Sequence, residues 1–178
     1  MEDKDKTVGF DSIKSGDLLF MRDDSQIGSA IRTATGCYSH VGIFFDGLLF
    51  HATRKKGVVK QELKSYLKEN PHEVFVYRYP EINLEEAKKT AEKYLGRPYN
   101  DSFYPNNGAF YCSQYVAEVL PIFGTVPMSF GDEKSKISEY WENYYEKLGL
   151  AVPLELEGTN PSQLASSEKL VFVGKLEQ

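Results

Sequence analysis

The sequence has few of the features that tie a chain to nucleic acid, to a membrane or to a disulfide scaffold. It contains two cysteines, Cys37 and Cys112, which are too few for a disulfide framework or a four-thiolate zinc site. Its 21 basic side chains are outnumbered by 26 acidic ones, whereas phosphate binding needs a basic face. No run approaches the roughly 18 apolar residues of a membrane-spanning helix. We therefore expect no nucleic-acid partner and no transmembrane segment.

Internal repeats, low-complexity tracts and long flexible linkers are also lacking. A chain of 178 residues has the ordinary size of one domain and can build a hydrophobic core without disulfides or metals. We therefore expect a single domain over residues 1–178. The N-terminal sequence MEDKDKTVGF is charged and has no apolar stretch, which predicts no signal peptide in the chain as given. The composition leaves the cytoplasm open, and also the cell envelope or periplasm if an export signal has been removed.

Hydrophobic periodicity and turn signals predict a mixture of strands and helices. The expected strands are residues 16–21, 40–45, 48–52, 73–77 and 170–173, and the expected helices are residues 25–33, 61–67, 84–95, 137–148 and a segment that starts near 112. Asp46 and Gly47 separate two of the strands, and an Asp-Gly pair there predicts a hairpin with a type I′ turn. Strands and helices mixed around an antiparallel hairpin indicate the α+β class.

The expected hairpin brings two histidines together. With a two-residue loop Gly42 pairs with His51, and residues two apart on a strand point to the same face. His40, Gly42 and His51 therefore share one face. The two histidines become diagonal neighbours about 7–8 Å apart at the backbone, and Gly42 leaves room for their rings. A loop with an odd number of residues would remove this arrangement.

Cys112 is expected at the start of a helix. The apolar positions that follow it at helical spacing are Tyr115, Val116, Val119 and Leu120. Free backbone N–H groups and the helix dipole at this end favour a thiolate, lower the thiol pKa and can hold an oxyanion. A cysteine, a histidine that takes its proton and a second histidine that orients the first form a complete nucleophile–base–orienter set.

The same residues allow other interpretations. A free cysteine on an apolar stripe is more often a small core residue, and a lone sheet histidine such as His51 is more often structural. His72 lies in a polar loop, which is typical of a solvated surface side chain, and Cys37 has no assigned role. His40, His51 and Cys112 could also be three ligands of a catalytic zinc ion, although no CxxC, HxxH or HExxH spacing supports such a site.

Five aromatic residues lie just before the expected helix, and they either line a substrate groove or belong to the core. They are Tyr99, Phe103, Tyr104, Phe110 and Tyr111.

Two segments carry a resemblance to a known family. SHVGIFFDGLLFHA (residues 39–52) and GRPYNDSFYPNNGAFYCSQYVAEVL (residues 96–120) resemble the NlpC-type papain-like cysteine peptidases. The histidine segment precedes the cysteine segment, which is similar to the circularly permuted YaeF/YiiX-like branch. GDLLF (residues 16–20) resembles the opening strand of this branch, and GTNPSQLASSEKL (residues 158–170) resembles its closing segment. The resemblance covers about residues 13–173.

The resemblance implies a permuted papain-like fold in which an antiparallel sheet packs against the helix that starts at the catalytic cysteine. It implies that Cys112 is the nucleophile, His40 the base and His51 the third polar residue. Tyr99, in GRPY, matches a tyrosine that borders the active site. We therefore predict a cysteine peptidase or amidase with a Cys-His-His triad, in which the Cys112 N–H and the Tyr99 hydroxyl stabilise the oxyanion.

The substrate class follows less directly. The chain has YCSQ where the family typically has DCSG, and it lacks the double glycine after the tyrosine, which argues against a standard peptidoglycan stem peptide. We expect a small amide-linked substrate, either a cell-wall peptide or an N-acylated amino acid or lipid, and no cofactor. The permuted architecture is shared with lecithin–retinol acyltransferase-like enzymes. A lipid acyltransferase or thioesterase is therefore one alternative, and a catalytically idle module that binds cell-wall or lipid fragments is another.

Overall fold

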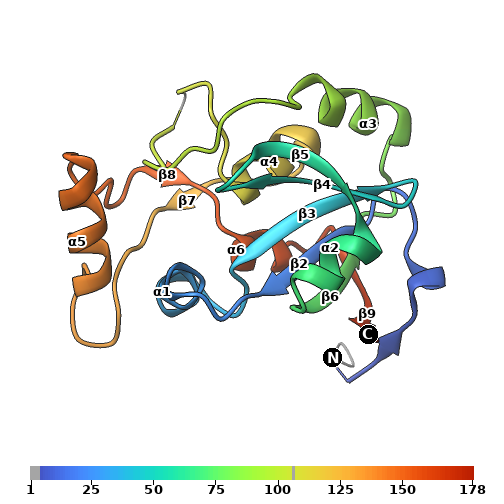
Figure 1. The fold of residues 1–178 in the computed structure, drawn as a ribbon, viewed down its shortest axis with the longest axis horizontal. Helices are drawn as coiled ribbons and strands as arrows, with labels where there is room; N and C mark the ends of the chain where they lie inside the picture. The colour runs from blue at the N-terminus through green and yellow to red at the C-terminus, as the bar shows by residue number, and fades with distance from the viewer. Residues whose placement is uncertain (1–4, 106) are drawn as a thin grey trace.

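A seven-stranded sheet forms the centre of the fold (Figure 1). The computed structural model describes residues 5–105 and 107–178. The strand order is β1-β9-β6-β2-β3-β4-β5. Every neighbouring pair is antiparallel except β1 with β9, which is parallel. The strands in chain order are β1 (Thr7–Val8), β2 (Leu18–Arg22), β3 (His40–Phe45), β4 (Leu48–Thr53), β5 (Gly57–Glu62), β6 (Glu73–Arg78) and β9 (Val171–Leu176).

The predicted hairpin between β3 and β4 is confirmed. Phe45 lies opposite Leu48 and Ile43 opposite Phe50, so the loop has two residues. Both loop residues adopt positive φ, 50° at Asp46 and 84° at Gly47. This is the conformation that a type I′ turn requires and that an Asp-Gly pair adopts at low cost. The residue parity that follows from a two-residue loop is therefore correct.

Helices cover both faces of the sheet, and the alternation of β-strand side chains supplies a core on each face. On one face the helices α3 (Leu84–Lys93) and α4 (Cys112–Val119) pack on Val41, Ile43 and Phe45 of β3. On the other face, α2 (Leu63–Glu69) packs on Leu49 and its neighbours. The mixed sheet-and-helix architecture confirms the α+β class. No helix in the described part of the chain is both long and apolar enough to span a membrane.

Two further helices, α1 (Gln26–Thr35) and α5 (Glu139–Leu148), lie beyond the end of the sheet where β3 begins (Figure 1). As predicted, Ser25 caps α1, and its hydroxyl accepts the Gly28 N–H at 3.1 Å. The predicted stop of α5 is also correct, because Gly149 takes a left-handed conformation there with φ of 69°. Buried aromatic and sulfur-containing side chains attach α5 to the loop before it: Met128, Phe130, Trp141 and Tyr145.

The remaining elements are short. They are the 3₁₀ helix η1 (Phe10–Ser12), the strand pair β7 (Val126–Pro127) with β8 (Glu157–Gly158), and α6 (Pro161–Ala165).

One predicted helix is present but begins later than expected. We expected it over residues 61–67, but Gln61 and Glu62 belong to the edge strand β5, and the helix begins at Leu63. β5 pairs with β4 at six successive positions, from Gly57 to Glu62, and this ladder outweighs the weak helical pattern. The Glu62 carboxylate then caps α2 by accepting the Ser65 N–H at 2.7 Å. The correction matters because it places the Gln61 side chain beside β4.

Candidate active site

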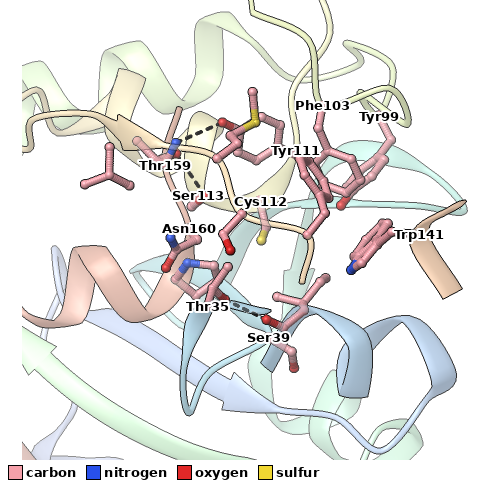
Figure 2. A pocket seen from close by; sticks show the side chains of 16 residues that line it. Thr35, Ser39, Tyr99, Phe103, Tyr111, Cys112, Ser113, Trp141, Thr159 and Asn160 are labelled. Carbon is pink, nitrogen blue, oxygen red and sulfur yellow. Dashed lines mark hydrogen bonds between the residues drawn. The ribbon is translucent and has the colours of Figure 1, made fainter. Parts of the chain in front are cut away.

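Cys112 is the first residue of α4, as predicted, and its side chain is 6% exposed. The apolar stripe behind it is buried: Tyr115, Val116, Val119 and Leu120. The start of the helix is fixed by the Gln114 side chain, which accepts the Tyr111 N–H and an N–H of Asn100, both at 3.1 Å. Figure 2 shows the sulfur of Cys112 in the middle of a cavity, with Tyr99, Tyr111 and Trp141 among the side chains that line it.

The backbone N–H of Val41 lies against the Cys112 sulfur because the sheet opens at this point. The Phe44 N–H donates to the Asp17 carbonyl on the β2 side, so by strand alternation the Val41 N–H points to the β4 side. The β3–β4 register ends at Ile43, two residues before it reaches Val41. The opening of this ladder therefore gives the thiol a backbone donor from the strand that also carries His40.

The resting thiol differs from the sequence expectation. Burial raises the pKa of Cys112 to about 11, and it outweighs the N–H groups of Val41, Ser113 and Cys112, which lower it. We expected the helix N-terminus to lower the thiol pKa. Desolvation dominates because the sulfur sits in an apolar cavity, so the thiol is neutral in the free protein near pH 7.

His40 and His51 meet side chain to side chain, as the hairpin parity predicts. The Nε2 atom of His40 lies 2.8 Å from Nδ1 of His51, and Nε2 of His51 lies 2.6 Å from Oε1 of Gln61. Gly42 makes this possible, since a Cβ on Gly42 would stand 3.1 Å from the Cβ of His51. Three strands, β3, β4 and β5, thus each contribute one member of a hydrogen-bonded row.

The row has a defined direction. An amide oxygen only accepts hydrogen bonds, so Nε2–H of His51 donates to Oε1 of Gln61. A neutral His51 then has an unprotonated Nδ1, which accepts from Nε2–H of His40. A neutral His40 is left with a free lone pair on Nδ1. In the structure the Gln61 amide is oriented with its Oε1 toward His51. In this orientation Gln61 sets the tautomer of both histidines.

Both histidines are neutral at physiological pH. Burial lowers the pKa of His51 to about 4 against a smaller opposing effect of the Gln61 hydrogen bond, and the Lys56 charge lowers it further. His51 has no exposed surface. Burial, together with the charges of His51 and His72, holds the pKa of His40 well below its usual value.

Cys112 and His40, the predicted nucleophile and base, line two adjoining cavities. The Cys112 cavity has a volume of about 50 Å³ and the His40 cavity one of about 150 Å³. Ile31, Ser39 and Tyr99 line both of them. Within residues 5–105 and 107–178 no hydrogen bond joins the Cys112 sulfur to His40. The structure therefore brings the two groups to neighbouring spaces without direct contact.

The aromatic cluster before α4 divides between the two expected roles. Tyr99, Phe103 and Tyr111 line the Cys112 cavity, whereas Phe110 and Tyr104 pack against the core. Burial and then the neighbouring Cys112 raise the pKa of Tyr99 well above its usual value. Its hydroxyl therefore stays protonated and available as a donor.

Sequence reasoning missed two residues of this region. Gln61 was hidden because it was assigned to the following helix, and the pairing of its strand with the strand of His51 is the signal that identifies it. His72 is half-buried rather than solvated. Its ring lies 6.4 Å from that of Tyr66, and it lines the His40 cavity. Cys37 is exposed.

A metal site would need converging donors. In the described part of the chain no group of three or more His, Cys, Asp or Glu side chains is placed to hold a metal ion. Nε2 of His40 and both ring nitrogens of His51 already take part in the row that ends at Gln61. The three-ligand zinc alternative is therefore not supported by this donor arrangement.

Comparison with known proteins agrees with the fold and the order of the motifs. The sequence model of the family described as permuted papain-like amidase enzymes, YaeF/YiiX, C92 family, matches residues 12–174. The chain is 29% identical over 180 residues to YiiX of Escherichia coli K12, covering 91% of this chain and 86% of that protein. The crystal structure titled as the metalloprotein YiiX of Escherichia coli O157:H7 aligns with a TM-score of 0.77 and 26% identity, over 92% of this chain and 98% of that one.

The matched region starts before β2 and ends within β9, so it contains the cysteine helix and all three strands of the histidine row. The chain belongs to the permuted papain-like amidase family, in its YaeF/YiiX branch, and it is a cysteine hydrolase of the amidase class.

Proposed function

We propose that the protein hydrolyses an amide bond through Cys112, His40 and His51, with Gln61 as a positioning residue behind them. The observation that carries the proposal is the directed row from Gln61 to His40, which leaves Nδ1 of His40 as a free base. A base of this kind is needed because the buried thiol is neutral at rest.

The proposed reaction begins when substrate enters and the thiol turns from the Val41 N–H toward His40. Nδ1 of His40 takes the thiol proton while the sulfur attacks the carbonyl carbon of the amide. Catalytic hydrogen bonds often tighten only when substrate is bound, so the separate cavities of the free protein are compatible with this step. The Cys112 N–H and the Tyr99 hydroxyl are the proposed donors to the oxyanion.

The intermediate then collapses with transfer of the same proton from His40 to the leaving nitrogen, which breaks the C–N bond and leaves a thioester on Cys112. Water attacks this thioester, and His40 takes a proton from that water. The C–S bond then breaks, His40 returns this proton to the sulfur, and the acid product leaves the restored thiol. The row through His51 to Gln61 keeps the proton of His40 on Nε2 and stabilises the imidazolium that forms in each half of the cycle.

The structural neighbour is titled a metalloprotein. Among the residues that the structure describes, no three His, Cys, Asp or Glu side chains are placed to hold a metal ion, and the proposed steps do not pass through one. The substrate classes that we propose are a cell-wall peptide and an N-acylated small molecule. An acyl acceptor held in place of water would turn the same thioester into the intermediate of an acyltransferase.

The test uses a Cys37→Ser background, so that Cys112 is the single thiol. This protein and its Cys112→Ala derivative are incubated with two substrate panels, muropeptides and N-acyl amino acids or amines. Products are measured by liquid chromatography with mass spectrometry, and acid-quenched protein is examined for an acyl group on Cys112. We expect release of an amine and an adduct that depend on Cys112. Equal turnover by the Cys112→Ala protein would show that hydrolysis takes place elsewhere.

A further inference from the structure

The indole N–H of Trp141 is buried without a hydrogen-bond partner in the described part of the chain. The side chain is 2% exposed, so water does not surround it. A buried indole N–H normally has an acceptor, and one without an acceptor calls for a specific explanation. Trp141 belongs to α5, which is remote from the sheet, yet it forms part of the wall of the Cys112 cavity.

Figure 2 shows the indole nitrogen at the end of the ring that faces the other lining side chains. The wall around it is largely apolar, with Ile31, Phe103, Met128 and Phe130. Among the described residues that line this cavity, none is Asp, Glu, Lys, Arg or His. Besides the Tyr99 hydroxyl, which we assign to the oxyanion, the cavity therefore offers the Trp141 N–H as a donor inside a neutral, largely apolar enclosure, which suits an uncharged group that carries a hydrogen-bond acceptor.

Four hydroxyl groups in the wall have partners within the protein. The Ser113 and Thr159 hydroxyls lie 3.0 Å apart, and the Ser39 hydroxyl donates to the Asp23 carboxylate at 3.0 Å. The Thr35 hydroxyl donates to the Ile31 carbonyl at 2.7 Å. The Trp141 N–H differs from these groups because no protein acceptor is within its reach.

The volume limits what the cavity can hold. About 50 Å³ is roughly a third of the ~150 Å³ of an engineered apolar cavity that binds benzene. The Cys112 cavity therefore takes a group of a few non-hydrogen atoms. A long hydrocarbon chain does not fit in it, and a carboxylate or ammonium group would find no counter-charge there.

The chemistry decides which side of the scissile bond enters this cavity. His40 must give its proton to the leaving nitrogen, so the leaving group lies in the His40 cavity, whose wall includes Asp23, Arg54 and His72. The acyl side then extends from the Cys112 sulfur into the Cys112 cavity. With the leaving group in the polar His40 cavity and the acyl group in the apolar Cys112 cavity, the scissile bond lies near Ile31, Ser39 and Tyr99, which line both cavities.

We propose that the Cys112 cavity is an acyl-binding subsite that selects short, uncharged acyl groups carrying a second acceptor oxygen, which accepts the N–H of Trp141. That the bound group is the acyl part of a substrate rests on the proposed function. That the cavity binds such a group does not. A site built around a buried donor discriminates strongly against an isostere that lacks the acceptor. The chosen substrate class is therefore a short oxygen-substituted acyl amide.

The first test measures binding without catalysis. Trp141 is the single tryptophan of the chain, so its fluorescence reports directly on this cavity. The Cys112→Ala protein is titrated with N-methyl methoxyacetamide and with N-methylbutyramide, which differ by one ether oxygen in place of one methylene. We expect saturable binding of the methoxy compound at least about tenfold tighter than that of the butyramide. N-methyloctanamide and succinamate test length and charge, and both should bind more weakly than the methoxy compound.

The proposal would be overturned if N-methylbutyramide, N-methyloctanamide or succinamate bound as tightly as the methoxy compound, or more tightly. Because the Cys112→Ala protein cannot form a thioester, this result is independent of whether the protein hydrolyses amides. A preference for the methoxy compound in a protein that turns over no amide would disprove the proposed function alone.

The second test removes the donor. Trp141→Phe keeps most of the ring and deletes the N–H, and protection of Cys112 from alkylation by iodoacetamide replaces fluorescence as the readout. We expect the methoxy compound to lose its advantage over the butyramide in this variant. Tyr140→Phe is the matched control, since Tyr140 packs on Trp141 with ring centroids 5.1 Å apart but does not line the cavity. Retention of the preference in Trp141→Phe would show that another group is the donor.

Discussion

Nε2 of His40 lies 2.8 Å from Nδ1 of His51, and this contact ties the proposed base to a residue on the next strand. Its direction is decided one strand further on, where Nε2 of His51 meets the Gln61 amide oxygen at 2.6 Å. The free lone pair on His40 thus depends on a residue that never approaches the thiol. The four expectations that follow derive from this row and from the buried Cys112.

Replacing Gln61 should slow the reaction without changing the residues that touch substrate. Gln61→Leu removes the acceptor that fixes the His51 tautomer, and we expect kcat/KM to fall about 10- to 100-fold, as for other residues that orient a functional histidine. Gln61→Glu keeps an acceptor and should retain most of the activity. Its carboxylate also favours the imidazolium form of His51, so the acidic limb of the pH–rate profile should move to higher pH. Equal losses in both variants, with unchanged profiles, would indicate a purely structural role.

The thiol should react slowly near neutral pH in the free protein. Because burial raises the pKa of Cys112 to about 11, its alkylation rate should rise continuously between pH 6 and 10. The measurement is the mass-spectrometric rate of iodoacetamide addition in a Cys37→Ser background, which removes the exposed thiol. A rate that reaches a plateau between pH 5 and 8 would instead indicate a preformed thiolate–imidazolium pair.

Acid should destabilise the fold through His51. Its folded-state pKa of about 4 lies below the unfolded value of 6.5, so the unfolded state binds the proton first as pH falls. The stability is therefore fully present above about pH 6.5 and is lost toward pH 4. The loss is on the order of 3 kcal/mol in the free energy of unfolding. Burial of His40 adds to the loss in the same direction.

Urea unfolding at pH 7 and at pH 4.5 measures this effect. The free energy of unfolding of the parent should fall more steeply between the two pH values than that of His51→Gln, which lacks the titrating group. The absolute stability of the variant does not matter, because only the difference between the two pH values is compared. Identical differences in the two proteins would contradict the assignment to His51.

Gly42 should be intolerant of even one added methyl group. A Cβ there would lie 2.6 Å from the Leu49 side chain and 3.1 Å from both the His51 Cβ and the Phe50 carbonyl oxygen. Gly42→Ala should cost about 1–3 kcal/mol in the free energy of unfolding and should shift His51 away from His40, lowering kcat. Gly124→Ala is the control, since nothing lies within 4 Å of a Cβ at that position. The check combines urea unfolding with turnover, and full activity of Gly42→Ala would show that the row tolerates displacement.

Local sequence signals were sufficient for much of the site. Asp46 and Gly47 determined the turn, and the turn determined that His40 and His51 share a face. The burial stripe after Cys112 determined the helix start. These inferences succeeded because each depends on neighbours a few residues away, where backbone sterics and residue period dominate.

Other features depended on contacts that the sequence does not reveal. Gln61 was misassigned because β5 is an edge strand stabilised by its ladder with β4, and such pairing outweighs local propensity. The thiol pKa was misjudged because the helix N-terminus is a local feature, whereas desolvation by the surrounding wall is not. The same holds for the half-burial of His72.

The sequence by itself determined the hairpin, the pairing of the two histidines and the position of the cysteine at a helix start. Only the tertiary structure decided that a glutamine directs the histidine row, that the thiol is buried and neutral, and that Trp141 reaches the cavity from α5. The physical reason is the range of the interactions. Turns and helix starts are set by adjacent residues, whereas dielectric environment and hydrogen-bond direction are set by whatever packing brings into contact.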